Sequence, residues 1–305
     1  MTAEPINAAA AGTWQLGDLS VNRLGFGAMR VTGSAAFDFG SSRDRDQSIR
    51  VLRQAVELGV NHIDTAAFYF SSLRSANELI NSALSPYPDD LVIVTKVGPG
   101  RDSWGEWTPR ATPQQLRGQV EENLRQLGRD HLDVVNLRVP GPGPIAEHYA
   151  ALLDLRDAGL IRHAGVAAVV PEQLAEAREV GPVVCVQNRY GLQIRDAATE
   201  DLLQTCRDAD IAFVPYFAIS GETGPRSAAG QDPASEPEPL RAVAHSHGVT
   251  TAQVRLAWTL HQGPNVLAIP GTGDPEHLVQ NVASAAIRLS PDELASLDAL
   301  GQPGP

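Results

Sequence analysis

Leu91-Val92-Ile93-Val94-Thr95-Lys96-Val97 is an apolar run that is broken only by a threonine and a lysine near its end. A continuous apolar run of this length predicts a strand that is buried on both faces, as strands in parallel sheets are. Seven other short apolar runs have the same character. The eight predicted strands comprise residues 24–29, 62–66, 91–97, 132–138, 163–169, 183–190, 212–217 and 266–271.

A longer helical pattern follows each predicted strand. These patterns comprise residues 42–58, 75–84, 113–127, 144–158, 171–180, 197–209, 250–261 and 275–285. Several begin with capping chemistry, such as Thr112-Pro113, where a capping residue precedes a proline at the first helical position. Eight strand–helix alternations with buried strands predict an α/β fold, a closed (β/α)8 TIM barrel, as one domain over residues 1–305.

Three segments fall outside the eight repeats. Residues 12–21 predict a β-hairpin that turns at Gly17-Asp18 and could cover the N-terminal mouth of the barrel. Residues 221–239 are rich in glycine, proline, alanine and serine and predict a long loop, which an additional helix over residues 240–247 follows. A capping box at Ser290-Pro291 predicts one more helix near the C-terminus.

The composition excludes several classes of function. The formal net charge of −12 argues against non-specific binding to nucleic acid or to an anionic membrane surface. The two cysteines, Cys185 and Cys206, lie in apolar patterns without metal-ligand spacing, which predicts free core thiols and no metal site. The first residues lack the features of a secretion signal, and no apolar stretch is long enough to span a membrane. We therefore expect a cytoplasmic protein.

Lys96 is the only lysine in the chain, because every other basic side chain is an arginine. It lies at the C-terminal end of a predicted strand, which is where barrel enzymes place their chemistry. Asp64 occupies the same position on the preceding strand, and Tyr69 follows five residues later. Asp64 could orient Lys96, and the ammonium could lower the pKa of Tyr69 so that the phenol donates a proton to a carbonyl oxygen. Each residue also has a purely structural alternative. Asp64 could be a structural cap, Lys96 a buried salt-bridge partner of Asp64, and Tyr69 a loop aromatic.

Several motifs resemble those of the aldo-keto reductases, and together they cover nearly the whole chain. They comprise residues 24–29 (LGFGAM), 61–66 (NHIDTA), 94–96 (VTK), 132–138 (LDVVNLR), 159–166 (GLIRHAGV), 186–188 (VQN) and 269–272 (IPGT). Within the family, residues 21–25, 133–138 and 184–188 are most similar to the pyridoxal-reductase group. The resemblance implies a (β/α)8 barrel that binds NADPH, with NADH as the alternative cofactor, and reduces a small-molecule carbonyl substrate.

The resemblance also assigns candidate site residues. Asp64, Tyr69 and Lys96 match three members of the family's catalytic tetrad, and Arg138 stands where the fourth, usually a histidine, is found. An arginine stays cationic, so it can bind a carbonyl oxygen but cannot shuttle protons at neutral pH. The alternative for Arg138 is a structural pair with Asp133. The residues implied to bind the cofactor are Gly27, Ala28, Met29, Gln187, Tyr216, Gly271, Thr272, His277, Gln280 and Asn281.

The sequence departs from the family pattern in three places. Ala167-Ala168 replaces a Ser-Asn pair that also holds the nicotinamide carboxamide, Phe70 replaces a glycine, and His277 replaces a phosphate-binding arginine. The N-terminus of the helix after Asp274-Pro275 could help to hold a phosphate, although a plain helix cap explains Asp274 equally well.

Three functions follow from these observations. The first is NADPH-dependent reduction of a small aldehyde or ketone, with pyridoxal the first substrate to test. The second is reduction of a larger keto substrate in specialised metabolism, and the third is a non-catalytic nucleotide-binding barrel. Four bulky residues could line a pocket for a flat substrate or simply pack: Trp104, Trp107, Phe70 and Phe217.

Overall fold

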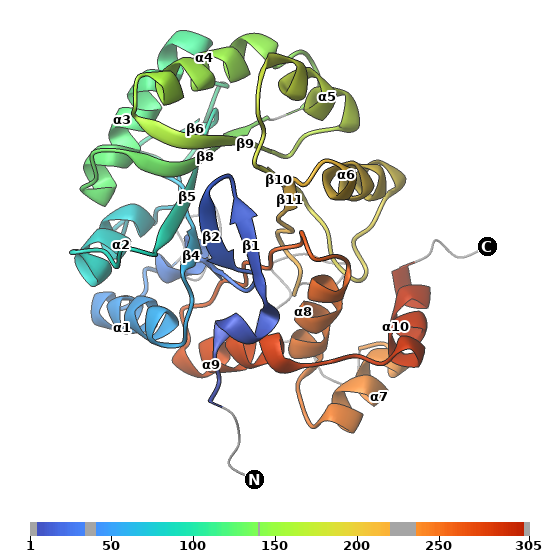
Figure 1. Ribbon diagram of the computed structural model, residues 1–305. Helices are drawn as coiled ribbons and strands as arrows, with labels where there is room; N and C mark the ends of the chain where they lie inside the picture. The colour runs from blue at the N-terminus through green and yellow to red at the C-terminus, as the bar shows by residue number, and fades with distance from the viewer. Residues whose placement is uncertain (1–4, 34–40, 140, 220–235, 302–305) are drawn as a thin grey trace.

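A computed structural model of the chain describes residues 5–33, 41–139, 141–219 and 236–301. Its central sheet has seven parallel strands in the order β11-β10-β9-β8-β5-β4-β3 (Figure 1). The strands are β3 (Phe26–Gly27), β4 (His62–Asp64), β5 (Val92–Val97), β8 (Leu132–Arg138), β9 (Ile161–Ala167), β10 (Cys185–Gln187) and β11 (Ala212–Phe213).

An extended segment around residues 266–268 closes this sheet into a barrel. On one side Leu267 N donates to Phe213 O at 2.9 Å, and on the other Gly25 N donates to Ala268 O at 2.8 Å. Parallel bridges pair Val266 with Phe213 and Ala268 with Leu24. The predicted (β/α)8 barrel is therefore confirmed, with its eighth strand reduced to these pairings.

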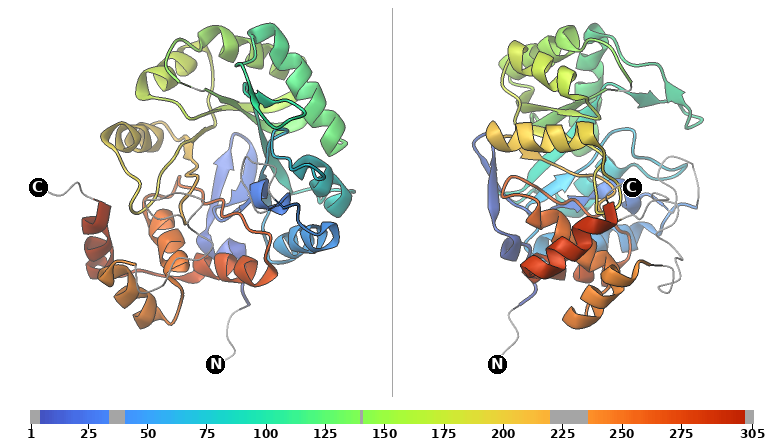
Figure 2. Two further views of the ribbon diagram at one scale, coloured as in Figure 1. Left: turned by 180° about the vertical axis from the view of Figure 1, so that it is seen from behind. Right: turned by 90° about the vertical axis from the view of Figure 1, so that its right-hand side faces the viewer.

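Helices surround the barrel on the outside (Figures 1 and 2). The α-helices are α1 (Arg45–Glu57), α2 (Ala76–Leu84), α3 (Leu116–Leu127), α4 (Ala146–Asp157), α5 (Pro171–Val180), α6 (Ala197–Asp208), α7 (Glu238–His247), α8 (Thr251–His261), α9 (Pro275–Ala283) and α10 (Pro291–Asp298). Short 3-10 turns are η1 (Ala8–Ala11), η2 (Ala28–Val31), η3 (Pro113–Gln115), η5 (Ser284–Ala286) and η6 (Ala299–Gly301). Each predicted helix is present, and the ends differ by a few residues.

The predicted N-terminal hairpin consists of β1 (Thr13–Leu16) and β2 (Leu19–Asn22). Its buried residues Leu16 and Val21 belong to the same apolar cluster as Val94 and Leu267, which point into the barrel. The hairpin thus covers the N-terminal mouth, as Figure 1 shows for the dark blue strands across the centre. Asp18 at the turn ties it to the barrel by accepting hydrogen bonds from Arg162.

The structure corrects several element boundaries. β9 begins two residues before the predicted strand 163–169, and β10 covers three residues of the predicted 183–190. A second hairpin, β6 (Gly100–Arg101) with β7 (Trp107–Thr108), was not predicted, because its strands are too short to show alternation. Most of the predicted loop 221–239, residues 221–235, lies outside the described residues, and α7 begins at Glu238.

Candidate active site

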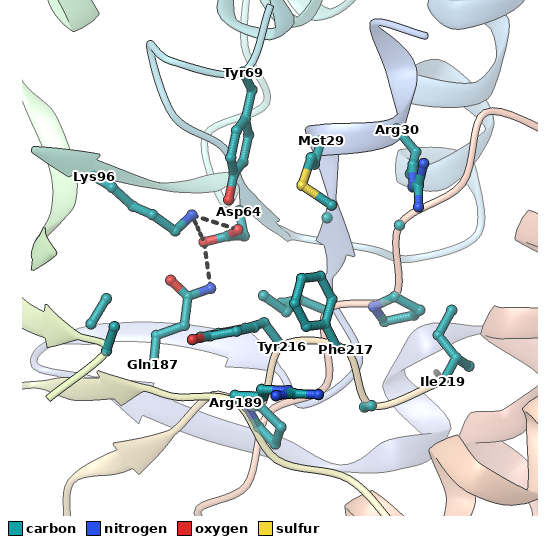
Figure 3. Close-up of a pocket in the computed structure, with 18 of the residues that line it drawn as sticks. Met29, Arg30, Asp64, Tyr69, Lys96, Gln187, Arg189, Tyr216, Phe217 and Ile219 are labelled. Carbon is teal, nitrogen blue, oxygen red and sulfur yellow. Dashed lines mark hydrogen bonds and ion pairs between the residues drawn. The ribbon is translucent and has the colours of Figure 1, made fainter. Parts of the chain in front are cut away.

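A cavity of about 480 Å³ opens at the carboxyl ends of the strands (Figure 3). Nine of the predicted site residues line it: Gly27, Met29, Asp64, Tyr69, Lys96, Arg138, Gln187, Tyr216 and Gly271. Parallel strands bring these residues together because their carboxyl ends meet at one end of the barrel. The cavity also includes Arg30 and Arg189, which were not predicted. Arg30 directly follows Met29 and Arg189 lies two residues after Gln187, so closeness to predicted site residues was the available signal.

Asp64 and Lys96 form a buried ion pair at the bottom of this cavity. Lys96 Nζ lies 2.7 Å from Asp64 Oδ1 and 2.8 Å from Oδ2, and it donates to Thr65 O at 2.9 Å. Adjacent strands place them side by side, since β4 pairs with β5 in parallel register. Burial lowers the pKa of Lys96, but its interactions with Asp64 and Tyr69 outweigh burial and raise it. The lysine therefore stays cationic at neutral pH.

Tyr69 lies on the loop between β4 and α2 and is 7% exposed. Its hydroxyl points toward Lys96 (Figure 3), whose Nζ lies 4.8 Å from the centre of the phenol ring. Burial raises the pKa of Tyr69 more than the Lys96 charge lowers it. The expected effect of the ammonium is therefore present, but burial of the phenol outweighs it. The phenol is protonated at neutral pH, and the Lys96 charge lowers the cost of its ionisation.

Gln187 links the ion pair to the opposite wall of the cavity. Its Nε2 donates to Asp64 Oδ2 at 3.0 Å, so the amide orientation is set by the carboxylate. Its Oε1 is buried and, among the described residues, contacts no donor. A buried acceptor without a donor is costly unless a ligand satisfies it. The ring of Tyr216 lies beside Gln187 (Figure 3), and β10 together with the segment after β11 positions the two side chains.

Arg138 ends β8 and reaches the same cavity, half-buried. Its guanidinium carbon lies 5.6 Å from the ring centre of Phe68 and 5.5 Å from that of Trp107. The alternative of an Arg138–Asp133 pair was wrong. The carboxylate of Asp133 instead binds Arg129 at 3.0 and 3.1 Å.

Backbone atoms form another part of the cavity wall. A Cβ on Gly27 would approach Ile269 O to 2.7 Å, and a Cβ on Gly271 would approach Gly27 O to 2.6 Å. Glycine at both positions thus allows the first strand and the closing segment to approach closely. Ala28 begins the short turn η2 and is buried, whereas Met29 faces the cavity.

The remaining predicted cofactor residues lie around the start of α9 and do not line the cavity. Thr272 is buried, and its Oγ1 accepts from Asp274 N at 3.0 Å. Asp274 Oδ1 accepts from the N–H groups of Glu276 and His277 at 2.8 and 3.2 Å, so its carboxylate caps the helix. The predicted helix cap is therefore present, and the phosphate site at this N-terminus stays a prediction. Further along α9, His277 is exposed, Gln280 is half-buried and Asn281 is buried.

Ala167 and Ala168 both line the cavity. Ala167 ends β9 and pairs with Gln187, whereas Ala168 has a φ of +58°, a left-handed conformation that alanine rarely adopts. Of the four bulky residues, Phe217 lines the cavity. Trp104 and Trp107 lie on the β6–β7 hairpin and are 78% and 44% exposed.

Comparison with known proteins agrees with this geometry. A model of the aldo/keto reductase family matches residues 23–302. This chain belongs to the aldo/keto reductase family. Like the family fold, its site lies at the carboxyl ends of the barrel strands. In the part of the chain that the structure describes, no helix is long and apolar enough to cross a membrane, and no cluster of His, Cys, Asp and Glu could hold a metal ion.

Several relatives resemble this aldo-keto reductase over nearly its whole length. Pyridoxine 4-dehydrogenase of Escherichia coli (strain K12) is 42% identical over 300 residues, covering 96% of this chain and 99% of its own. The solved structure of the thermostable aldo-keto reductase Tm1743 with the inhibitor epalrestat superposes with a TM-score of 0.79 at 30% identity, covering 95% and 99%. An aldo-keto reductase of Klebsiella pneumoniae in complex with NADP and acetate gives 0.74 at 29%, covering 93% of each chain.

Proposed function

We propose that this protein is an NADPH-dependent reductase that converts a small aldehyde or ketone into an alcohol, with a pyridoxal-like aldehyde as the favoured substrate. The observation that carries the proposal is the buried Lys96–Asp64 pair beside Tyr69 at the cavity wall. The relation to the Escherichia coli pyridoxine 4-dehydrogenase supports the choice of substrate.

The residues around the cavity fit a nicotinamide cofactor. Gln187 Oε1 is a buried acceptor without a donor among the described residues, and the amide group of a nicotinamide could supply that donor. Gly27 and Gly271 both line the cavity on the side of the closing segment. Tyr216 would offer its ring face for stacking. The Klebsiella pneumoniae relative was crystallised with NADP, which supports the same cofactor here.

When bound, a reduced nicotinamide supplies the hydride. Tyr69 donates its phenolic proton to the carbonyl oxygen of the substrate, and the Lys96 ammonium stabilises the phenolate that remains. Asp64 keeps Lys96 charged and in place through two short contacts. Arg138 donates hydrogen bonds to the carbonyl oxygen as negative charge develops there, without giving up a proton itself.

Two further parts of the proposal concern the protein as a whole. We propose a single barrel domain, which the family match over residues 23–302 supports. We also propose a cytoplasmic location. Cys185 and Cys206 are buried free thiols, which is typical of proteins in a reducing compartment, and burial raises the pKa of both to about 12.

The test compares Tyr69→Phe with Tyr87→Phe. Tyr87 is a matched control, because its hydroxyl donates to Leu127 O at 2.6 Å and Tyr87 does not line the cavity. NADPH and NADH are titrated by cofactor fluorescence, and turnover is measured with pyridoxal and with a panel of bulkier ketones. We expect saturable NADPH binding in all three proteins and a loss of turnover of at least about 100-fold in Tyr69→Phe alone.

Three outcomes would contradict the proposal. Unchanged turnover in Tyr69→Phe would refute the assigned acid. Turnover of bulky ketones only would favour the larger-substrate alternative. Binding of neither cofactor by the native protein would favour a non-catalytic barrel.

A further inference from the structure

The β6–β7 hairpin contacts the parts of the molecule that carry two proposed catalytic residues. These are the loop around Tyr69 and the side chain of Arg138 at the end of β8. Figure 2 (right) shows this green hairpin projecting from the side of the molecule opposite the dark blue N-terminal hairpin. Its strands pair Gly100 with Thr108 and Arg101 with Trp107. These two pairs place Arg101 and Trp107 opposite each other, and the two side chains make different contacts with the barrel.

Arg101 ties the hairpin to the loop that carries Tyr69. Its Nη1 donates to Phe70 O at 3.0 Å and to Phe68 O at 3.4 Å, the carbonyls on either side of Tyr69. Its Nε donates to Gly105 O at 2.8 Å within the hairpin turn, so one guanidinium bridges both segments. The guanidinium also lies over the ring of Phe70, 4.4 Å from its centre. The hairpin is therefore fixed to the Tyr69 loop and does not merely lie near it.

Trp107, on the other strand, contacts the arginine at the end of β8. The Arg138 guanidinium carbon lies 5.5 Å from the Trp107 ring centre and 5.6 Å from the Phe68 ring centre. The two rings are 5.6 Å apart and inclined at 59°. These three nearly equal separations form a triangle in which two aromatic faces contact one cation, an arrangement favoured by cation–π attraction. Phe68 is buried, whereas Trp107 is 44% exposed.

A cation at this position needs such support for a physical reason. Arginine has a long side chain with many rotamers, whereas the histidine usual in the family has two side-chain torsions. An arginine can bind a carbonyl oxygen effectively only if its guanidinium is held in place before the substrate arrives.

We infer that Phe68 and Trp107 are positioning residues that hold Arg138 at the cavity wall, and that the β6–β7 hairpin thereby forms part of the subsite for the substrate's carbonyl oxygen. This inference rests on the proposed function for its effect on turnover. The placement of the guanidinium does not depend on that function. The hairpin then positions both proposed catalytic groups. Arg101 holds the loop of Tyr69, the proton donor, and Trp107 holds Arg138, the cation that binds the carbonyl oxygen.

The experiment compares Trp107→Leu, Trp107→Phe and Trp104→Leu. Trp104 is a matched control on the same hairpin, because it is 78% exposed, whereas Trp107 is 44% exposed. With saturating NADPH, we expect Trp107→Leu to lower kcat for an aldehyde about tenfold, Trp107→Phe to keep activity within about threefold, and Trp104→Leu to have no effect. The affinity for NADPH should stay unchanged in all three variants.

Two readouts separate positioning from general damage. In an Arg138→Ala background, Trp107→Leu should cause no further loss of kcat, since the group it positions is gone. In nitrogen-15 NMR spectra, the Arg138 Nε–H signal, assigned by its loss in Arg138→Lys, should lose an aromatic ring-current shift in Trp107→Leu but not in Trp104→Leu.

An additive loss of kcat in the Arg138→Ala background, or an unmoved Arg138 signal, would overturn the inference. The NMR result stands even for a protein that turns over no aldehyde, so failure of the proposed function is distinguishable from failure of the positioning role.

Discussion

Ala168 offers a test of backbone strain at the edge of the cavity. Its φ of +58° brings the Cβ close to the following carbonyl oxygen, which costs roughly 1–2 kcal/mol in an L-residue. The hydrogen bond from Ala168 N to Gln187 O, at 2.9 Å, fixes this conformation. Ala168→Gly removes the clash but adds about 0.5–1 kcal/mol of unfolded-state entropy. The net expectation is a gain of about 0.5–1 kcal/mol in the free energy of unfolding.

The neighbouring residue provides the control. Ala167 lies in β9, is buried, and pairs with Arg138 and Gln187 in the sheet. Ala167→Gly relieves no clash, loses a buried methyl worth about 0.8 kcal/mol and adds the same glycine entropy. It should therefore destabilise the fold by about 1.5 kcal/mol. Adjacent Ala→Gly changes are thus expected to act in opposite directions.

Denaturant titrations of the two variants and the native protein measure both changes in the free energy of unfolding. The comparison requires that the dependence of this free energy on denaturant concentration is the same in all three proteins. If both glycine variants lost stability to the same degree, the strain at Ala168 would not exist. A third variant, Ala168→Asn, keeps the left-handed conformation and returns a polar group to the cavity wall. It should bind NADPH severalfold more tightly, by one added hydrogen bond.

Two other predictions concern pH. With a non-ionising aldehyde, kcat/KM of the native protein should not change near pH 6.5, because an arginine stays charged there. Arg138→His should introduce a change of kcat/KM in this range. A native profile with a pKa in the histidine range would contradict the role of Arg138. Burial, aided by the Lys96 charge, lowers the pKa of His62 to about 4 from 6.5. As the pH falls, His62 binds a proton in the unfolded chain before it does so in the folded protein. Stability is therefore lost as the pH falls from 6.5 towards 4, by about 2 kcal/mol between pH 7 and 5. Denaturant titrations at both pH values should show that His62→Gln removes most of this loss. If the variant lost as much stability between pH 7 and 5 as the native protein, the role of His62 would be refuted.

The sequence predicted the barrel well because buried strands and capped helices leave strong local signals. The run 91–97 and the run 132–138 correspond almost residue for residue to β5 and β8, in which every residue except Arg138 is buried. The eighth strand was predicted over residues 266–271, although its pairing is limited to bridges. The β6–β7 hairpin escaped prediction because two-residue strands carry no periodic pattern.

The candidate site was predictable to the extent that strand ends determine it. Asp64, Lys96, Arg138 and Gln187 meet at the cavity because each lies at or near the end of a parallel strand. Their interactions were harder to predict. The sequence alone does not show that Asp133 binds Arg129 and not Arg138. It also does not show that Arg138 lies near two aromatic rings, since Phe68 and Trp107 approach it only through tertiary packing.

The carboxylate of Asp64 connects the two halves of the proposed chemistry. Lys96, beside the phenol, and Gln187, on the opposite wall, both donate to its Oδ2, at 2.8 and 3.0 Å. One buried oxygen therefore sets the position of the charge near the proton donor and the orientation of the amide proposed to hold the cofactor. Loss of this carboxylate would leave a buried ammonium unpaired, at a cost of about 3–5 kcal/mol, and would free the Gln187 amide to turn. Residues joined in this way act as a unit, so the effects of substituting Asp64, Lys96 and Gln187 should fall well short of additivity. A strongly acidic chain that keeps a single lysine keeps it at the one place where this network needs a compact cation.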